Sequence, residues 1–480
     1  MEVRLEEALD LVGHSRHNVL ILIVSSTVHL AAVLDLLGFC VLVPAASCDL
    51  KLDLMEIGML TSVPFAGYLS ALPWGYYADT QGRRKAIIVS TIVGSALAIV
   101  TSFSSSFEMM LILKLIGCSF STASITLTIT YLGECTGSRH RNKYIFIMNS
   151  FNLASDFTCY ALAYGILRLE FNIAIPWLSI TYRPWRLLAL VMALMLAVGA
   201  VMMLCLHESP KFLANRGHVD KALSVLKSSY GLKGNDADYL RSLMTIDHVA
   251  LSLKPTFWSS VVAQTIPIFK PPLVLKTLQL FFLMSVCLST NNVFFMWFPT
   301  MVNSFYSSMS DTQSGFCEKI ISNLTNEISE DVICDDTVAN NTIYSGMAFS
   351  VFFTLVNFLT SRLAKWRKIV LLSTLTISGI SAVLVDIIHQ PIVSMMLFIF
   401  IQLSGILTGN VASYFVDLYP TSYRGLGTSL GLMCARMTCL AGVNIVGGTI
   451  VSHCSMTFFG WAVFVLCGIA VAWFLPSDKK

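Results

Sequence analysis

The stretch GYYADTQGRRKAIIVS, residues 75–90, decides how the rest of the chain is interpreted. It places Asp79 and three consecutive cations, Arg83, Arg84 and Lys85, between two apolar segments that carry almost no charge. Lysine and arginine concentrate in the short loops that remain on the cytoplasmic side of a membrane. The stretch therefore indicates a cytoplasmic turn between two membrane-spanning segments.

The composition also favours a membrane protein. Of the 480 residues, 55% are hydrophobic and only 12% are charged, whereas soluble domains average about 25% charged residues. A helix crosses the hydrocarbon layer with about 20 apolar residues. Segments of that kind are residues 19–46, 56–78, 86–106, 109–133, 144–167, 187–206, 277–304, 344–362, 369–388, 391–416, 427–450 and 456–475. The sequence thus predicts an all-α polytopic membrane protein with 12 transmembrane helices.

The distribution of charge predicts the orientation of these spans. If the N-terminus, residues 1–18, is cytoplasmic, most of the 31 lysines and arginines fall in loops on the cytoplasmic side. The C-terminal tail, residues 476–480, is then cytoplasmic as well. The formal charge of +3 reflects this bias. No nucleic-acid partner is expected, because a nucleic-acid-binding face gathers its cations on one soluble surface.

Two long connections divide the chain. Residues 207–276 are predicted as a cytoplasmic linker between an N-terminal half, residues 19–206, and a C-terminal half, residues 277–475. Residues 305–343 are predicted as an acidic loop on the outer or luminal side.

The outer loop carries two N-glycosylation sequons, at Asn323 and Asn340, and such sites are used only where they face the secretory lumen. The loop also contains Cys317 and Cys334, which can form a disulfide in that oxidising compartment. Two free thiols, or a bond to another cysteine such as Cys48, remain the alternatives.

Six helices, a linker and six further helices are the layout of a transporter whose substrate site lies between two halves near the middle of the membrane. After the second span, Gly75, Asp79 and Gly82 form, with the three cations, the pattern G-x-x-x-D-x-x-G-R-R-K. This pattern resembles the signature of the major facilitator superfamily. The resemblance implies that the cluster latches the cytoplasmic ends of the two halves in one state and releases them in the other.

Three further motifs are similar to those of the sugar-porter and organic-ion branches of this superfamily. YLGECTGSRHR contains Glu134 and Arg141, HESPKFLANRG contains Glu208, and DLYPTSYRGLG contains Asp417 and Arg424. They follow spans four, six and ten. The resemblance implies that these charges belong to the same gate.

Longer stretches narrow the resemblance. LDLLGFCVLVPAASCDL, YRPWRLLALV and FFMWFPTMV resemble the synaptic vesicle glycoprotein 2 group and its shorter insect relatives. The second half departs from the superfamily pattern, because NFLTSRLAKWRK has Asn357, Ser361 and Ala364 where glycine, aspartate and glycine are expected. The outer loop is also shorter than the large luminal domain of that group. A role in synaptic vesicles is therefore not carried over.

Four ionisable residues within the spans are candidates for function, because each costs about 2.5–3.5 kcal/mol in a membrane unless it is paired or faces water. Asp35 and Lys114 are expected to interact near the central cavity and to couple transport to a proton or an organic ion. A static pair that holds helices together is the alternative. Asp156 either lines the path or bonds neighbouring helices. Arg436 either balances the charge of an anionic substrate, pairs with an acid or extends toward the interface.

Asn291 and Asn292 precede an aromatic run that includes Trp297. Two amides beside aromatic rings are typical of a cavity wall, although aromatic residues also gather at membrane interfaces. The similarity of the WFP segment to the vesicle-glycoprotein group favours a position of Trp297 in the cavity.

The sequence contains no G-x-S-x-G motif, no Walker loop and no metal cluster of His and Cys, so an enzyme, a cofactor and a metal are not expected. The leading hypothesis is a secondary active transporter of a small organic solute, either an organic ion or a sugar-like molecule. It would work by alternating access as a monomer, in the plasma membrane or a vesicle membrane. The alternative is a transporter-like receptor or vesicle-trafficking protein that binds a ligand without moving it.

Overall fold

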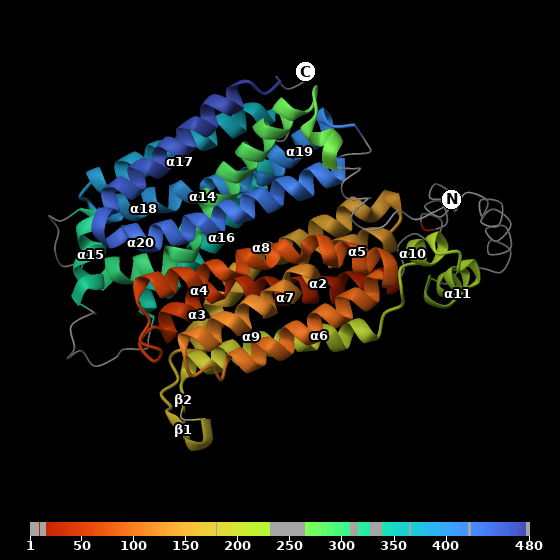
Figure 1. The fold of residues 1–480 in the computed structure, drawn as a ribbon, viewed down its shortest axis with the longest axis horizontal. Coiled ribbons are helices and arrows are strands. Elements are labelled where there is room, and N and C mark those ends of the chain that lie inside the picture. Colours follow the sequence, from red (N-terminus) through yellow and green to blue (C-terminus); the bar gives the residue numbers. More distant parts are fainter. Residues whose placement is uncertain are drawn as a thin grey trace.

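The computed structural model of the chain describes residues 9, 16–178, 180–230, 265–307, 315–326, 338–363, 366–420 and 424–476. Most of these residues lie in helices that run side by side in two bundles, one from each half of the chain (Figure 1). Each bundle supplies six crossing segments. The prediction of an all-α polytopic membrane protein with twelve spans in two halves is confirmed.

The N-terminal half contains the first six crossings. They are α2 (Arg16–Leu37) continued by α3 (Phe39–Ala46); α4 (Leu54–Ala66) continued by the 3-10 turn η1 (Gly67–Ser70) and α5 (Ala71–Gln81); α6 (Arg83–Thr101); α7 (Phe107–Cys135); α8 (Ser138–Ile166); and α9 (Pro184–Leu204). A small antiparallel hairpin connects α8 to α9. It consists of β1 (Ile173–Ile175), η2 (Pro176–Leu178) and β2 (Ile180–Tyr182), with Ile173 opposite Tyr182.

The C-terminal half contains the other six crossings. They are α14 (Val274–Ser307); α16 (Asn340–Arg362); α17 (Arg367–Ile387); α18 (Pro391–Ile401) continued by η6 (Gln402–Leu407) and α19 (Thr408–Leu418); and the two arms of α20 (Arg424–Trp473), which bends at His453. Between the halves in sequence come α10 (Pro210–Asn215), α11 (Val219–Tyr230) and η4 (Ile266–Phe269). The short helix α15 (Phe316–Asn326) lies in the predicted outer loop.

Length and apolarity alone identify fewer crossings than the fold contains. Nine helical segments in the described ranges are long and apolar enough to cross a membrane, with the two arms of α20 counted together. The crossing α4–η1–α5 is interrupted by its 3-10 turn, and α8 starts with the polar residues SRHRNK. Both nevertheless run along the other helices of the N-terminal half (Figure 1).

Local hydrogen bonds fix where two of the helices begin. Asp53 Oδ1 accepts a hydrogen bond from the Glu56 backbone N–H (2.6 Å), and Glu56 Oε2 accepts one from the Asp53 N–H (3.0 Å). This capping box satisfies donors that the first turn of α4 leaves free. Ser106 Oγ accepts from the Met109 N–H (3.3 Å) and caps α7 in the same way.

The two ends of the bundle differ in chemistry. We call the end that carries the 79–85 turn the motif end, and the end that carries the β1–β2 hairpin and α15 the hairpin end (Figure 1). Both outermost crossings have their terminal residues at the motif end. The ring of His17 lies 6.1 Å from that of His207, and Lys368 Nζ donates a hydrogen bond to the Leu475 carbonyl (2.5 Å). The first described crossing therefore begins, and the last one ends, at the same end of the bundle.

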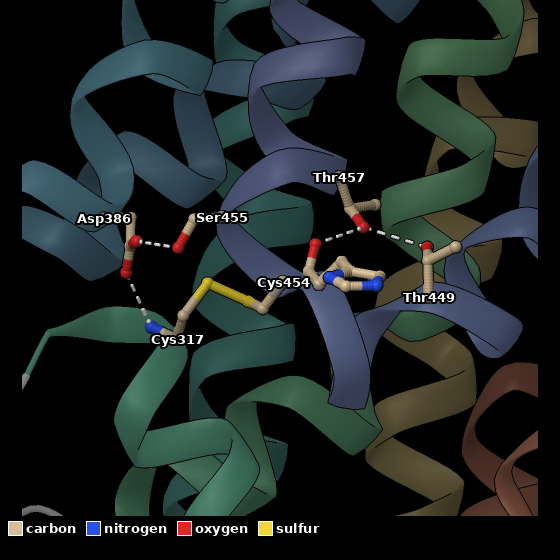
Figure 2. Close-up of a disulfide and its surroundings, with 7 residues drawn as sticks. Cys317, Asp386, Thr449, Cys454, Ser455 and Thr457 are labelled. Carbon is tan, nitrogen blue, oxygen red and sulfur yellow. Dashed lines mark hydrogen bonds between the residues drawn. A yellow bond between two sulfur atoms is a disulfide. The ribbon is translucent and has the colours of Figure 1, made fainter.

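A disulfide between Cys317 and Cys454 joins α15 to the bend of α20 (Figure 2). The predicted pairing of Cys317 with Cys334 is therefore wrong in its partner. The two cysteines are 137 residues apart in sequence, but packing of α15 on the C-terminal half brings their Cα atoms to 5.7 Å. Cys334 lies outside the described residues, and Cys48 is itself disulfide-bonded.

Asp386 on α17 holds both partners of this disulfide in place. Its Oδ1 accepts a hydrogen bond from the Cys317 backbone N–H (2.9 Å), and its Oδ2 accepts one from Ser455 Oγ (2.5 Å) (Figure 2). One carboxylate thus ties α15 and the second arm of α20 to α17.

We expect Cys317→Ser to lower the free energy of unfolding by about 2–4 kcal/mol, because the cross-link closes a long loop of the unfolded chain. The measurement is thermal or denaturant unfolding of the purified protein in detergent. Cys467→Ser, which removes an exposed free thiol, is the matched control and should have little effect. Non-reducing peptide mapping that recovers Cys317 joined to another cysteine would contradict the assignment.

Candidate functional site

The turn at the motif end is organised by one arginine and one glycine. Arg83, the first residue of α6, forms an ion pair with Asp79 and donates from Nε to Glu134 Oε1 of α7 (3.0 Å). Gly82 connects α5 to α6 with φ +113° and ψ 147°, a conformation that is essentially restricted to glycine. The predicted grouping of Asp79, Gly82, Arg83 and Glu134 is present.

Glu208 has a role that the sequence did not reveal. Its carboxylate accepts hydrogen bonds from the backbone N–H groups of Arg84 (2.9 Å) and Lys85 (3.4 Å) and so caps the N-terminus of α6. A carboxylate is favourable there because the free N–H groups and the helix dipole place positive charge at a helix N-terminus. A Cβ atom on Gly82 would clash with Glu208 Oε2. Glycine at this position therefore makes room for the cap.

The second half has a corresponding ion pair with a different acid. Arg367, the first residue of α17, pairs with Asp417 at the end of α19 and donates to Ser413 Oγ (3.1 Å). Its guanidinium lies 4.6 Å from the ring centre of Tyr414. Asp417 therefore provides the carboxylate that Ser361 lacks.

Two further cations of the predicted gate, Arg141 and Arg424, are not in the ion pairs described above. Arg141 at the start of α8 donates to the Thr136 carbonyl (3.5 Å), and Arg424 begins α20. Gly75 has open space where a Cβ would lie. The ion pairs of Arg83 and Arg367 each lie within one half of the molecule.

Contacts between the two halves are found toward the hairpin end. Trp297 of α14 is 1% exposed and donates from Nε1 to the Val443 carbonyl of α20 (3.0 Å). Its indole fills the space between Gly58 of α4 and Gly447 of α20, where added Cβ atoms would come within 3.3 and 2.9 Å of the ring. Trp297 is thus a buried wedge between the halves.

A polar set of contacts closes the outermost turns of α8 and α16. Arg168 Nε donates to Asn340 Oδ1 (3.1 Å), and the hydroxyls of Tyr164 and Tyr344 are hydrogen-bonded at 3.1 Å. Asn340, one predicted glycosylation site, is therefore the first residue of α16 and contacts the other half. Asn323, the other site, lies on α15.

The predicted pair of Asp35 and Lys114 is present and deeply buried. Lys114 Nζ on α7 donates to Asp35 Oδ1 of α2 (2.7 Å) and to the Asp35 backbone carbonyl (2.5 Å), while Ser121 Oγ donates to Asp35 Oδ2 (2.8 Å). The two residues are 5% and 4% exposed. Both carboxylate oxygens have a donor, so the charge of Asp35 is balanced inside the N-terminal half.

The other predicted site residues lie in two places. Asp156 faces α14 from α8, whereas Asn291 and Asn292 lie near the contact between α14 and α20. Asp156 lines a narrow pocket with Tyr160 of α8 and Phe295 of α14. Asn291 donates to Asn292 (3.3 Å), and Asn292 donates to Cys439 Sγ of α20 (3.7 Å).

Arg436 of α20 contacts the N-terminal half through aromatic rings. Its guanidinium lies 4.4 Å from the ring centre of Tyr68 and 5.8 Å from that of Phe65. A cation above an aromatic face is attracted by the electron-rich ring. Among the described residues, Arg436 is therefore partnered across the two halves by rings rather than by an acid.

Comparison with known proteins identifies the class that this geometry represents. The family model of the Major Facilitator Superfamily matches residues 26–318, more than half of the chain. The chain belongs to this superfamily, whose members are transporters rather than enzymes.

Individual relatives are more distant. The Synaptic vesicle 2-related protein of Xenopus laevis is 24% identical over 224 residues, which cover 46% of this chain and 38% of that protein. Synaptic vesicle glycoprotein 2B of Mus musculus is 23% identical over 248 residues, which cover 51% and 36%. The chain thus spans less than half of the length of these relatives.

Solved structures show the same fold over nearly the whole chain. The inward open conformation of the xylose transporter XylE from E. coli matches with a TM-score of 0.67 at 13% identity, covering 96% of this chain and 97% of that one. The partially occluded inward open conformation of XylE matches with a TM-score of 0.66 at 14% identity, covering 97% and 99%.

We expect Gly82→Ala to destabilise the protein by about 1–3 kcal/mol, because alanine is strained at this positive φ and its Cβ displaces the Glu208 cap. The matched control is Gly75→Ala in α5, where nothing lies within 4 Å of the new Cβ. Alanine there should be neutral or stabilising by about 0.5–1 kcal/mol. Unfolding midpoints in detergent compare the two; equal effects would contradict the described turn.

Proposed function

We propose that the protein is a secondary active transporter that moves a small organic solute across a membrane by alternating access between its two halves. The observation that carries this proposal is the distribution of contacts. Trp297, Arg168–Asn340 and Tyr164–Tyr344 join the halves toward the hairpin end. The ion pairs of the motif end lie within single halves. The two halves thus contact each other at the hairpin end, while the ion pairs of the motif end do not join them. This arrangement corresponds to one state of an alternating-access cycle.

The membrane orientation predicted from the distribution of lysine and arginine indicates which state of the cycle this is. If the motif end faces the cytoplasm, as its cations favour, the structure corresponds to an inward-facing state. In the opposite state, the carboxylates Asp79 and Asp417 would bind cations of the other half, while the contacts of Trp297 would separate. This exchange of partners is the latch that the family resemblance implies.

The buried pair of Asp35 and Lys114 is proposed as the coupling site for a proton. Lys114 could leave Asp35 if the carboxyl took up a proton, because the protonated form needs no counter-charge. The structural likeness to a protein described as a D-xylose-proton symporter (TM-score 0.63, 14% identity, 96% of this chain and 98% of that one) supports this assignment. A static pair is the alternative role, because both carboxylate oxygens of Asp35 already have a hydrogen-bond donor.

A receptor that binds a ligand without transporting it is the second candidate. It is favoured by the sequence at Ser361, where the second half lacks the aspartate of the superfamily pattern. The pair of Arg367 with Asp417 weakens this argument, because the second half still has an acid for its latch.

The first test is counterflow in sealed proteoliposomes loaded with D-xylose, choline or succinate and supplied with the same labelled solute outside. A transporter exchanges at least one of these classes, and a receptor exchanges none. In Arg168→Cys/Asn340→Cys, a short thiol cross-linker should abolish exchange by holding the hairpin end closed. Arg168→Cys alone, treated with the same reagent, is the control. Exchange that survives complete cross-linking would exclude alternating access through this end.

The second test separates coupling from a static role of the buried pair. Lys114→Met leaves a buried carboxylate unpaired and should cost about 3–5 kcal/mol of stability, whereas Asp35→Asn/Lys114→Met should recover most of that loss. If the pair couples transport, the double variant retains counterflow but loses accumulation driven by a pH gradient. Retained accumulation would assign the pair a structural role only.

A further inference from the structure

We propose that Asp156, Tyr160 and Phe295 form a binding site for the cationic head group of a small organic amine. The inference rests on the proposed transport function and specifies its substrate class. The site is a closely packed junction of the first crossing, α8 and α14 that has no room for a water molecule in this structure, so a ligand would enter it only after the walls separate. Its walls therefore come from both halves of the molecule, which is where a solute carried by alternating access has to bind.

The first supporting observation is the isolation of the Asp156 carboxylate. Its side chain is hydrogen-bonded to Ser155, and no ion pair of Asp156 occurs in the described part of the chain. Asp35, by contrast, has both Lys114 and Ser121. A carboxylate in the membrane interior without a counter-charge is costly, and an ammonium ligand would supply the missing charge.

The second observation is the hydroxyl of Tyr160, one turn further along α8. The side chain is fully buried, at 0% exposure, and within the described residues its hydroxyl has no hydrogen-bond partner. A buried polar group that lacks a partner is destabilising, and a bound ligand is one explanation for such a group. Tyr160 and Asp156 line the same pocket. A protonated amine can donate hydrogen bonds to both.

Aromatic rings complete the site. Phe295 faces the pocket from α14, and the Tyr160 ring contacts that of Phe298 edge-on with centroids 6.5 Å apart. Ring faces attract organic cations, most strongly where water is excluded. A carboxylate, a phenol and aromatic rings together favour a cation over a sugar, which needs several hydrogen-bonding partners rather than one strong charge.

The charge of the other candidate residue agrees with this choice. Arg436 already has the rings of Tyr68 and Phe65 as partners. These rings attract the guanidinium, whereas the described part of the chain gives the Asp156 carboxylate no cationic partner. A positively charged ligand is therefore the one that would complete the site at Asp156.

The site is also linked to the closed hairpin end. The Tyr160 ring lies directly against Gly346 of α16, where a Cβ atom would clash with it, and the next turn of α8 carries Tyr164 with its bond to Tyr344. A ligand that moves Tyr160 would therefore act on the contact between α8 and α16. Ligand binding at Tyr160 and closure of the hairpin end through Tyr164 would therefore involve the same face of α8.

The test is thermal stabilisation of the purified full-length protein by tyramine, choline, succinate and D-xylose. A ligand that binds only the folded state raises the unfolding midpoint. We expect both amines to stabilise the protein, and Asp156→Asn to weaken their binding at least tenfold. Glu108→Gln, which removes an exposed carboxylate in the first turn of α7, is the control and should bind as the unmodified protein does.

Tyr160→Phe distinguishes the two amines. It should weaken tyramine, which has N–H donors, and leave choline nearly unchanged, because a quaternary ammonium has none. If Asp156→Asn fails to fold, this comparison of tyramine with choline in Tyr160→Phe provides the second measurement.

Stabilisation by succinate or D-xylose alone, or amine binding that Asp156→Asn does not change, would overturn the proposed site. Counterflow separates this result from a failure of the proposed function. Exchange of D-xylose or succinate without any amine binding would reject the site and keep the transporter. Amine binding through Asp156 without exchange of any solute would keep the site and reject transport.

Discussion

Lipid offers a protein neither counter-charges nor hydrogen-bond partners, and this constraint determines the arrangement of polar groups in the whole molecule. Within the bundle, Asp35 is neutralised by Lys114, and Arg436 lies against the ring of Tyr68. Asp156 departs from this pattern, because its bond to Ser155 leaves its charge unbalanced. A departure of this kind in the membrane interior points to a site that a ligand or a proton completes.

The two ends of the molecule are held together by interactions of different strength. At the motif end, the side chains of Asp79 and Asp417 are 62% and 48% exposed in their ion pairs, and exposed pairs of this kind contribute only about 0–1 kcal/mol. Toward the hairpin end, Trp297 is buried between glycines of both halves. Partner exchange among weak, hydrated charges costs little, so the motif end is suited to a reversible latch and the buried indole to a seal.

Much of the fold was predictable because each crossing leaves a local signal in the sequence, an apolar run between polar turns. The pair of Asp35 with Lys114 was also predictable, because a charged residue within a membrane span is costly unless it finds an opposite charge or water. The disulfide of Cys317 was not, because its partner Cys454 is brought near by the packing of α15 and the bend of α20. Proximity along the chain says little about such pairs.

The role of Glu208 shows the same limit at the motif end. Its motif predicted a charge near the gate, but the partners of Glu208 are backbone N–H groups of α6, which no side chain in the sequence reveals. Gly82 lies directly against the Glu208 carboxylate. This contact links the two motifs in the folded protein, but it cannot be seen in the sequence. Sequence patterns identified the charged side chains of this site, and the structure was needed to find what they bind.

The halves also contribute unequally to the proposed chemistry. In the N-terminal half, Arg83 has two acids, and the same half provides Asp156 and the Tyr160 hydroxyl. The C-terminal half contributes the Asp417 latch, and its groups nearest to the pocket are the rings of α14 such as Phe295. A solute would then be held by charge on one half and covered by an apolar surface of the other. Because an apolar surface gives up few directional bonds when it separates, the C-terminal half is the one suited to move over a ligand that remains bound to the N-terminal half.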